Sequence, residues 1–273
     1  LQLAGELLDF AERSLDLTAG DNYRTLVEVD GPVTWNVVAT PEFSLQPKSW
    51  CFPVAGCVSY RGYFEQTDAD DFAGRMSGKG YDVAVTPAAA YSTLGWFDDP
   101  LLDTMLERSA AQLAGTLFHE LAHQKFYVKG DSEFNESYAT AVEEFGVVRW
   151  LQARGDDEAL EKYWQNREFR QRVMRYVAET RDDLEEYYSE TIDDDEKRLL
   201  KEHRLELLQQ QVAETTTDAG IESSSWLSGH LNNARLASMS LYEGRLPEFR
   251  QLFVDCEMDI ECFYARAEEL AAR

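Results

Sequence analysis

The sequence is poor in basic residues, histidine and proline, and it has no long apolar run. Its 26 lysines and arginines face 51 aspartates and glutamates, a net charge of −25. Such an acidic surface repels phosphate backbones, so we expect no nucleic-acid partner. No stretch approaches the about 18 apolar residues of a membrane span. Two interpretations of the charge remain open: a solvated surface that favours solubility, and an adaptation to high salt.

Cysteine is also scarce, but its four copies form two close pairs with five residues between the members of each. An even count in local pairs indicates disulfides and an oxidising compartment. Three connectivities are possible, of which we predict Cys51–Cys57 and Cys256–Cys262. Four buried thiols are the alternative, and a shared zinc site is less favoured because its usual gaps are about two to four residues.

The apolar pattern divides the chain into a strand-rich part and a helical part. An amphipathic helix over residues 3–15 is followed by β-rich segments and one short helix, and an Asp-Pro pair at Pro100 signals a helix start. We expect strands at 33–38, 52–60, 81–85 and 90–97, and helices at 68–79, 134–151, 157–188, 194–217, 224–242 and 246–270.

This order predicts an α+β fold and not a doubly wound one. We expect a small mixed-sheet subdomain over residues 1–99 and a mostly helical subdomain over residues 100–273. A helical hairpin at about residues 157–217 belongs to the second subdomain.

The candidate metal-binding and catalytic residues lie within residues 119–136. His119 and His123 are four residues apart on an expected helix, so their imidazoles project from one face and can bind one zinc ion. Glu120 lies beside the first histidine, where its carboxylate can take a proton from a zinc-activated water. The alternative is a chance match with two satisfied core histidines, but uncompensated imidazoles on so apolar a helix would be costly.

A catalytic zinc site needs a third protein ligand. Glu136 follows His123 by 13 residues, and Lys129-Gly130-Asp131 supplies the turn that would return its helix to the histidines. Glu143 is seven residues further on the same helical face, and we predict that it supports a ligating histidine through a hydrogen bond. Glu144, or a merely solvated glutamate, is the alternative.

Long stretches of the chain resemble a family of predicted zinc aminopeptidases from Gram-negative bacteria. The resemblance extends over nearly the whole sequence. The matching stretches are residues 35–37, 41–45, 50–64, 90–100, 118–144 and 232–236.

The resemblance implies a zincin-like peptidase with zinc on His119, His123 and Glu136 and with Glu120 as the base. Family members commonly begin with a lipoprotein-type signal, which implies a location on the periplasmic side of a bacterial envelope and a membrane tether through a lipid anchor. The Gly-x-Met-Glu-Asn motif by which well-studied zinc aminopeptidases hold a substrate amine does not occur in this sequence. Aminopeptidase activity therefore rests on the family and not on residues that can be named.

Substrate binding is predicted before the histidine helix. In zincins the substrate backbone lies along a strand edge beside that helix, and main-chain hydrogen bonds hold the peptide. We predict that Thr93, Leu94, Gly95 and Trp96 form this edge; an ordinary interior strand is the alternative. Tyr242 is predicted to stabilise the oxyanion, with Tyr138 as the second choice.

The expected function is thus a zinc-dependent peptidase, most simply an aminopeptidase on short peptides. The alternatives are a non-catalytic zinc-containing envelope protein and an endopeptidase that acts on a protein partner. The sequence does not indicate the oligomeric state.

Overall fold

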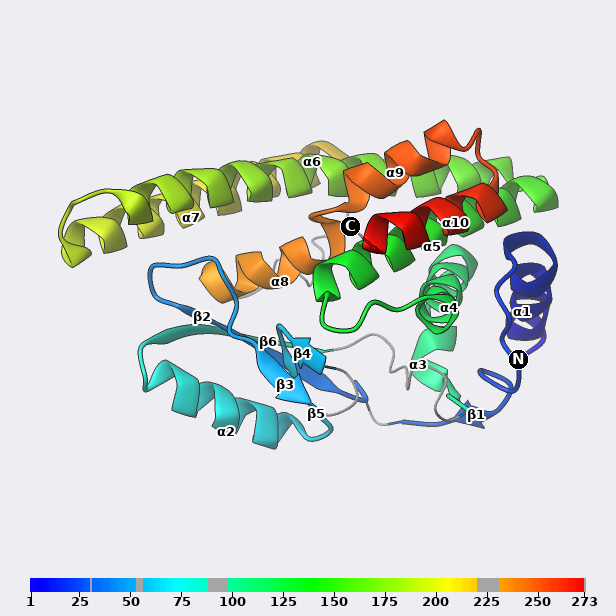
Figure 1. The fold of residues 1–273 in the computed structure, drawn as a ribbon, viewed down its shortest axis with the longest axis horizontal. Helices are drawn as coiled ribbons and strands as arrows, with labels where there is room; N and C mark the ends of the chain where they lie inside the picture. The colour runs from blue at the N-terminus through cyan, green and yellow to red at the C-terminus, as the bar shows by residue number, and fades with distance from the viewer. Residues whose placement is uncertain (30, 53–55, 88–97, 220–230, 273) are drawn as a thin grey trace.

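The computed structural model describes residues 1–273 except 30, 53–55, 88–97, 220–230 and 273 (Figure 1). This part of the chain is mostly helical with small sheets, which confirms the predicted mixture of a small β-rich part and a larger helical part. The described elements are α1 (Gln2–Leu15), β1 (Leu26–Val27), β2 (Trp35–Pro41), β3 (Trp50–Phe52), β4 (Gly56–Val58), β5 (Arg61–Tyr63), α2 (Gln66–Ser77), β6 (Tyr81–Pro87), β7 (Leu101–Leu102), α3 (Asp103–Leu106), α4 (Ala110–Lys125), α5 (Ser132–Arg154), α6 (Asp157–Ser189), α7 (Asp194–Ala219), α8 (Asn233–Glu243), α9 (Leu246–Asp255) and α10 (Ile260–Ala271).

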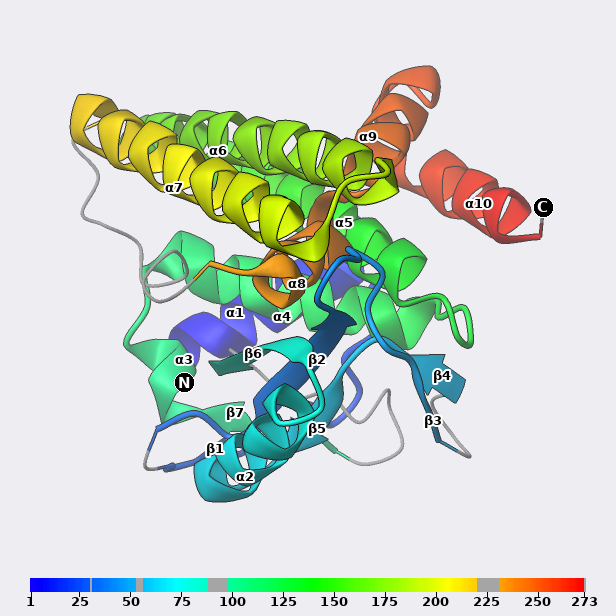
Figure 2. The same ribbon diagram turned by 90° about the vertical axis from the view of Figure 1, so that its left-hand side faces the viewer.

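The three-stranded antiparallel sheet has the order β5-β2-β6. Helix α2 lies on one side of it and α8 on the other (Figure 2). Small side chains of α8, Ala234 and Ala237, pack against Val38 of β2 and Ala84 of β6, so the helix approaches the sheet closely. The β-rich stretch expected over residues 52–60 contains the end of β3 and all of β4, which pair as a separate hairpin. The main sheet instead takes its third strand from the residues that follow, β5.

The main hydrophobic core lies among α1, α4, α5, α9 and α10. Leu7 and Leu15 of α1 share it with Phe118 of α4, Phe249 of α9 and Phe263 of α10, all of them fully buried. The core thus joins the first helix to the helical part of the chain. The subdomain boundary at residue 99 stays a prediction, and this packing crosses it.

The predicted helical hairpin is present as α6 and α7, which run side by side along one edge of the molecule (Figures 1 and 2). Val173 and Val177 of α6 pack against Leu208 and Val212 of α7, and α8 closes the same core with Leu236. An ion pair between Lys201 of α7 and Asp82 of β6 attaches the hairpin to the sheet.

Two predicted helix boundaries are wrong. The helix expected over residues 246–270 is broken into α9 and α10, because Glu257 and Met258 adopt positive φ angles of 51° and 63° and the Asp259 side chain caps a new helix. The helix start expected at Pro100 is displaced: residues 101–102 form β7 beside β1, and α3 begins at Asp103. A backbone hydrogen bond from Leu101 to Thr25 holds this bridge, and such a distant contact leaves no local sequence signal.

Both predicted disulfides are present, Cys51–Cys57 across the β3–β4 hairpin and Cys256–Cys262 across the break between α9 and α10. Cys51 and Cys57 are exposed, whereas Cys256 is buried. Among the described helices, none has the length and apolar character needed to cross a membrane.

We expect that replacing Cys256 and Cys262 together by serine lowers the free energy of unfolding by about 2 kcal/mol, since the bond closes only a short loop in the unfolded chain. Urea titration of both proteins measures the difference. Mass spectrometry after alkylation without reduction is the accompanying check, and four alkylated thiols in the unmodified sequence would contradict both disulfides.

Candidate metal centre

Helix α4 carries the two histidines. A capping box fixes its start: the Ser109 hydroxyl accepts from the Gln112 backbone N–H, and the Gln112 side chain accepts from the Ser109 backbone N–H. Leu113, Leu117 and neighbouring apolar residues of α4 are buried in the main core. The helix is therefore held along its length, and His119 and His123 project together from one stripe of it, with side chains only 12% and 8% exposed.

A short turn after α4 returns the chain into α5, as predicted. The buried Asn135 side chain accepts a hydrogen bond from the Val128 N–H and donates one to the Val128 carbonyl, both at 2.8 Å. The Asp131 side chain caps α5 by accepting from the Phe134 N–H. These bonds fix the start of α5 against the end of α4, and so place Glu136 beside the histidines.

Three donor atoms converge between the two helices. Nε2 of His119 lies 3.2 Å from Oε2 of Glu136 and 3.2 Å from Nε2 of His123, and the remaining distance, from His123 Nε2 to the carboxylate, is 3.6 Å. A zinc ion bound tetrahedrally at about 2.0–2.1 Å from each atom separates its ligands by about 3.4 Å. The residues brought together here therefore fit a zinc ion in both donor type and spacing.

The other ring nitrogen of His119 is also engaged. Its Nδ1 lies 3.1 Å from Oε2 of Glu143, so a proton on Nδ1 leaves the Nε2 lone pair free for a metal. Glu144, the sequence alternative, points elsewhere and accepts from Arg167 of α6 and Arg250 of α9. His123 differs from His119, because its buried Nδ1 has no hydrogen-bond partner among the described residues.

The cluster is electrostatically coupled. Burial by itself would lower the pKa of His119, but hydrogen bonds and charge from Glu136 and Glu143 outweigh it and hold that pKa well above its usual 6.5. Burial would raise the pKa of both carboxyls, yet each is lowered, that of Glu136 mainly by His123 and that of Glu143 mainly by His119. Metal binding would therefore displace a proton from the cluster.

Glu120 lies next to this cluster and is partly exposed. Burial raises its pKa, and the positive charge of the two histidines only partly opposes that shift. Within the described part of the chain its carboxylate has no hydrogen-bond partner. It is therefore available to bond a water molecule and to exchange a proton with it.

Of the residues predicted to bind the substrate or the oxyanion, the structure describes the side chain of Tyr138 alone. Residues 93–96 lie outside the described residues, and Tyr242 belongs to α8 but its side chain is likewise not described. Tyr138 is 1% exposed. Its ring stacks on Phe263 and meets Phe249 edge to face in the main core, on the side of α5 turned away from Glu136. The structure therefore does not bring Tyr138 to the metal centre.

Tyr127 was missed by the sequence argument. It is partly exposed, and burial, followed by the charge of Glu136, raises its pKa. Its neighbour Phe126 turns into the core against Phe134 and Tyr138. Tyr127 follows His123 by four residues, but α4 ends at Lys125 and Phe126 is extended, so helical spacing gave no signal for Tyr127.

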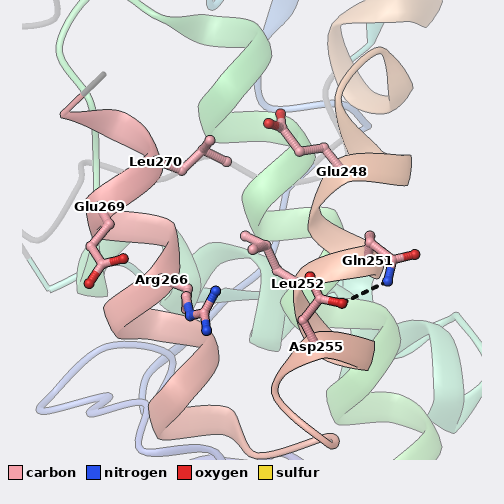
Figure 3. Close-up of a pocket in the computed structure, with 7 residues that line it drawn as sticks. All are labelled: Glu248, Gln251, Leu252, Asp255, Arg266, Glu269 and Leu270. Atoms are coloured by element: carbon pink, nitrogen blue, oxygen red, sulfur yellow. Dashed lines mark hydrogen bonds between the residues drawn. The ribbon is translucent and has the colours of Figure 1, made fainter.

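A separate groove of about 360 Å³ lies between α9 and α10 (Figure 3). Leu252 and Leu270 face it from the two helices, and Glu248, Asp255 and Glu269 contribute acidic side chains around it. None of the predicted site residues lines this groove, so we assign it no part in the metal centre.

Two helices that present two histidines and one glutamate to a common point define a candidate metal centre of the His-Glu-x-x-His type. The chain matches the model of the family described as "Putative aminopeptidase" over residues 1–273, and it belongs to that family. No curated protein and no solved structure matches it.

We expect one zinc ion per chain, and we expect His119→Ala or His123→Ala to remove it, because each change deletes one of three protein ligands. Metal analysis after dialysis measures the stoichiometry. His203→Ala on the exposed surface of α7 is the matched control and should retain the ion. Stoichiometric zinc in either ligand variant would contradict the site.

We also expect zinc affinity to fall as the pH falls, since the raised pKa of His119 lets protons compete with the metal. Competition with a chromophoric chelator between about pH 6 and pH 8 gives the affinity at each pH. An affinity independent of pH over that range would show that no ligand loses a proton on binding.

Proposed function

We propose that this chain is a zinc peptidase and that it acts as an aminopeptidase on short peptides. The observation that carries the proposal is the convergence of His119 Nε2, His123 Nε2 and Glu136 Oε2. The Glu120 carboxylate, which has no hydrogen-bond partner among the described residues, lies next to this cluster. When bound, zinc would polarise the substrate carbonyl and lower the pKa of a water molecule. Family membership supports peptide substrates.

Glu120 is the general base in this proposal. Its carboxylate accepts a proton from the attacking water and then passes it to the leaving amine nitrogen as the peptide bond breaks. A raised pKa suits both steps, because the protonated form must persist long enough to donate. His119, His123 and Glu136 hold the ion, and Glu143 keeps the His119 ring oriented.

The developing oxyanion needs a hydrogen-bond donor besides the ion. Tyr242 remains our prediction from sequence, and Tyr127 is the second candidate, supported by its partial exposure and its place beside Glu136. The edge formed by Thr93 to Trp96 remains the proposed binding site for the substrate backbone. The zincin-like fold is part of the same proposal, supported by the helix pair and the neighbouring antiparallel sheet.

The two disulfides support a location outside the cytosol. Because Cys51 and Cys57 are exposed, the cytosolic thiol pool would reduce a bond between them. We therefore infer that the protein works in an oxidising compartment, and we propose the periplasmic side of a bacterial envelope. Anchoring by a lipid remains an expectation from the family resemblance.

The zinc-loaded protein should be incubated with matched peptide mixtures whose N-termini are free in one and acetylated in the other, and the products identified by mass spectrometry. An aminopeptidase releases single N-terminal residues from the free peptides only. Internal cleavage of both mixtures would instead support the endopeptidase alternative. Zinc binding without cleavage of either mixture would support the non-catalytic alternative.

We expect Glu120→Gln to keep zinc and to lose turnover by about two to four orders of magnitude, because the ligands remain while the base is gone. Single-turnover rates and metal content, measured on one preparation, separate the two properties. Glu12→Gln on the exposed face of α1 is the control and should match the unmodified rate. Normal turnover by the Glu120 variant would exclude Glu120 as the base.

A further inference from the structure

Gly115 lies in α4 one turn before His119 and is buried beneath the Glu143 side chain of α5. A Cβ atom at Gly115 would lie 2.9 Å from Oε1 of Glu143 and 3.3 Å and 3.4 Å from its Cγ and Cδ atoms. The carboxyl group therefore rests directly on the helix backbone, in the space that any other residue would fill.

The two oxygens of this carboxylate have different surroundings. Oε1 lies over Gly115, while Oε2 lies 3.1 Å from Nδ1 of His119. The space above Gly115 thus sets how closely Glu143 can approach the histidine ring. A methyl group at residue 115 would push on the flexible end of Glu143, so Glu143 and not the helix would move.

We propose that Gly115 is a positioning residue for the metal centre: it admits the Glu143 carboxylate that holds His119 with Nδ1 protonated and Nε2 directed at the metal. This inference rests on the zinc site of the proposed function. It concerns the tautomer and orientation of one ligand, because a hydrogen bond at one ring nitrogen decides which nitrogen is free to bind.

Gly146 provides a matched contrast on the facing helix. A Cβ atom there would lie 2.7 Å from the Phe118 ring and 2.8 Å from Leu15, both fully buried in the main core. These neighbours are packed on all sides and cannot move aside. A methyl group at Gly146 should therefore disturb the core and leave the Glu143–His119 contact in place.

The experiment compares Gly115→Ala with Gly146→Ala. Alanine has a higher helix propensity than glycine, so the Gly115→Ala protein should have a melting temperature no lower than that of the unmodified protein. It should nevertheless bind zinc about 10–100-fold more weakly, because this is the usual effect of losing such a supporting contact. Gly146→Ala should show the opposite pattern, with a lower melting temperature and unchanged zinc affinity. Unchanged affinity in Gly115→Ala would overturn the proposal.

A double-mutant cycle with Glu143→Ala tests whether Gly115 acts through Glu143. With no carboxylate to displace, Gly115→Ala should cause no further loss of zinc affinity in the Glu143→Ala background. An equal loss in both backgrounds would mean that the methyl group disturbs α4 directly, and would refute the positioning role.

A readout without metal distinguishes failure of this inference from failure of the zinc assignment. At a pH above the raised pKa of His119, where its ring is neutral, the ¹⁵N chemical shifts of His119 report its tautomer in the metal-free chain. Gly115→Ala should shift them toward the mixture of tautomers that an unsupported imidazole shows. If the unmodified protein bound no zinc, the proposed function would fail, but this shift would still support the positioning role. Identical shifts in both proteins would refute it.

Discussion

The close packing of α4 against α5 is the contact on which the metal centre depends, since two ligands come from one helix and the third from the other. Gly115 and Gly146 lie at this contact and leave room for Glu143 and Phe118 respectively. The same helices are fixed beyond the site by the Ser109 capping box and by the bonds between Asn135 and Val128. The site is therefore held from both ends, and its distances do not depend on an exposed loop.

The residues that make up the candidate metal centre explain why binding of a cation is favourable there. Glu120, Glu136 and Glu143 place three carboxylates beside His119 and His123, and burial of so many like charges is unfavourable. Protonated His119 relieves part of this repulsion in the metal-free chain, as its raised pKa indicates. A divalent ion between neutral imidazoles would leave a local charge of about −1, from three carboxylates and two positive charges, without the need for a buried proton.

Those parts of the fold and of the candidate site whose signal is local in sequence could be predicted. The spacing of His119, His123 and Glu136 fixed the candidate ligands, and the apolar periodicity fixed α1 and the hairpin of α6 and α7. The break between α9 and α10 was missed because apolar residues continue at helical spacing through it. Gly115 was missed because its importance comes from a residue 28 positions away on another helix, and no local pattern records that approach.

The electrostatic potential at the candidate metal centre influences which peptides this centre would bind. An aminopeptidase must hold a cationic amine next to the bond it cleaves, whereas an endopeptidase holds an uncharged internal segment. Burial raises the pKa of Glu120, the positive charge of His119 and His123 opposes that shift, and the negative charge of Glu136 and of the buried Asp99 adds to it. The chain as a whole carries −25, which attracts cationic ligands over longer distances at low ionic strength. A positive N-terminus is thus favoured near this cluster over an acetylated one, which supports the exopeptidase part of the proposal on electrostatic grounds as well as by family.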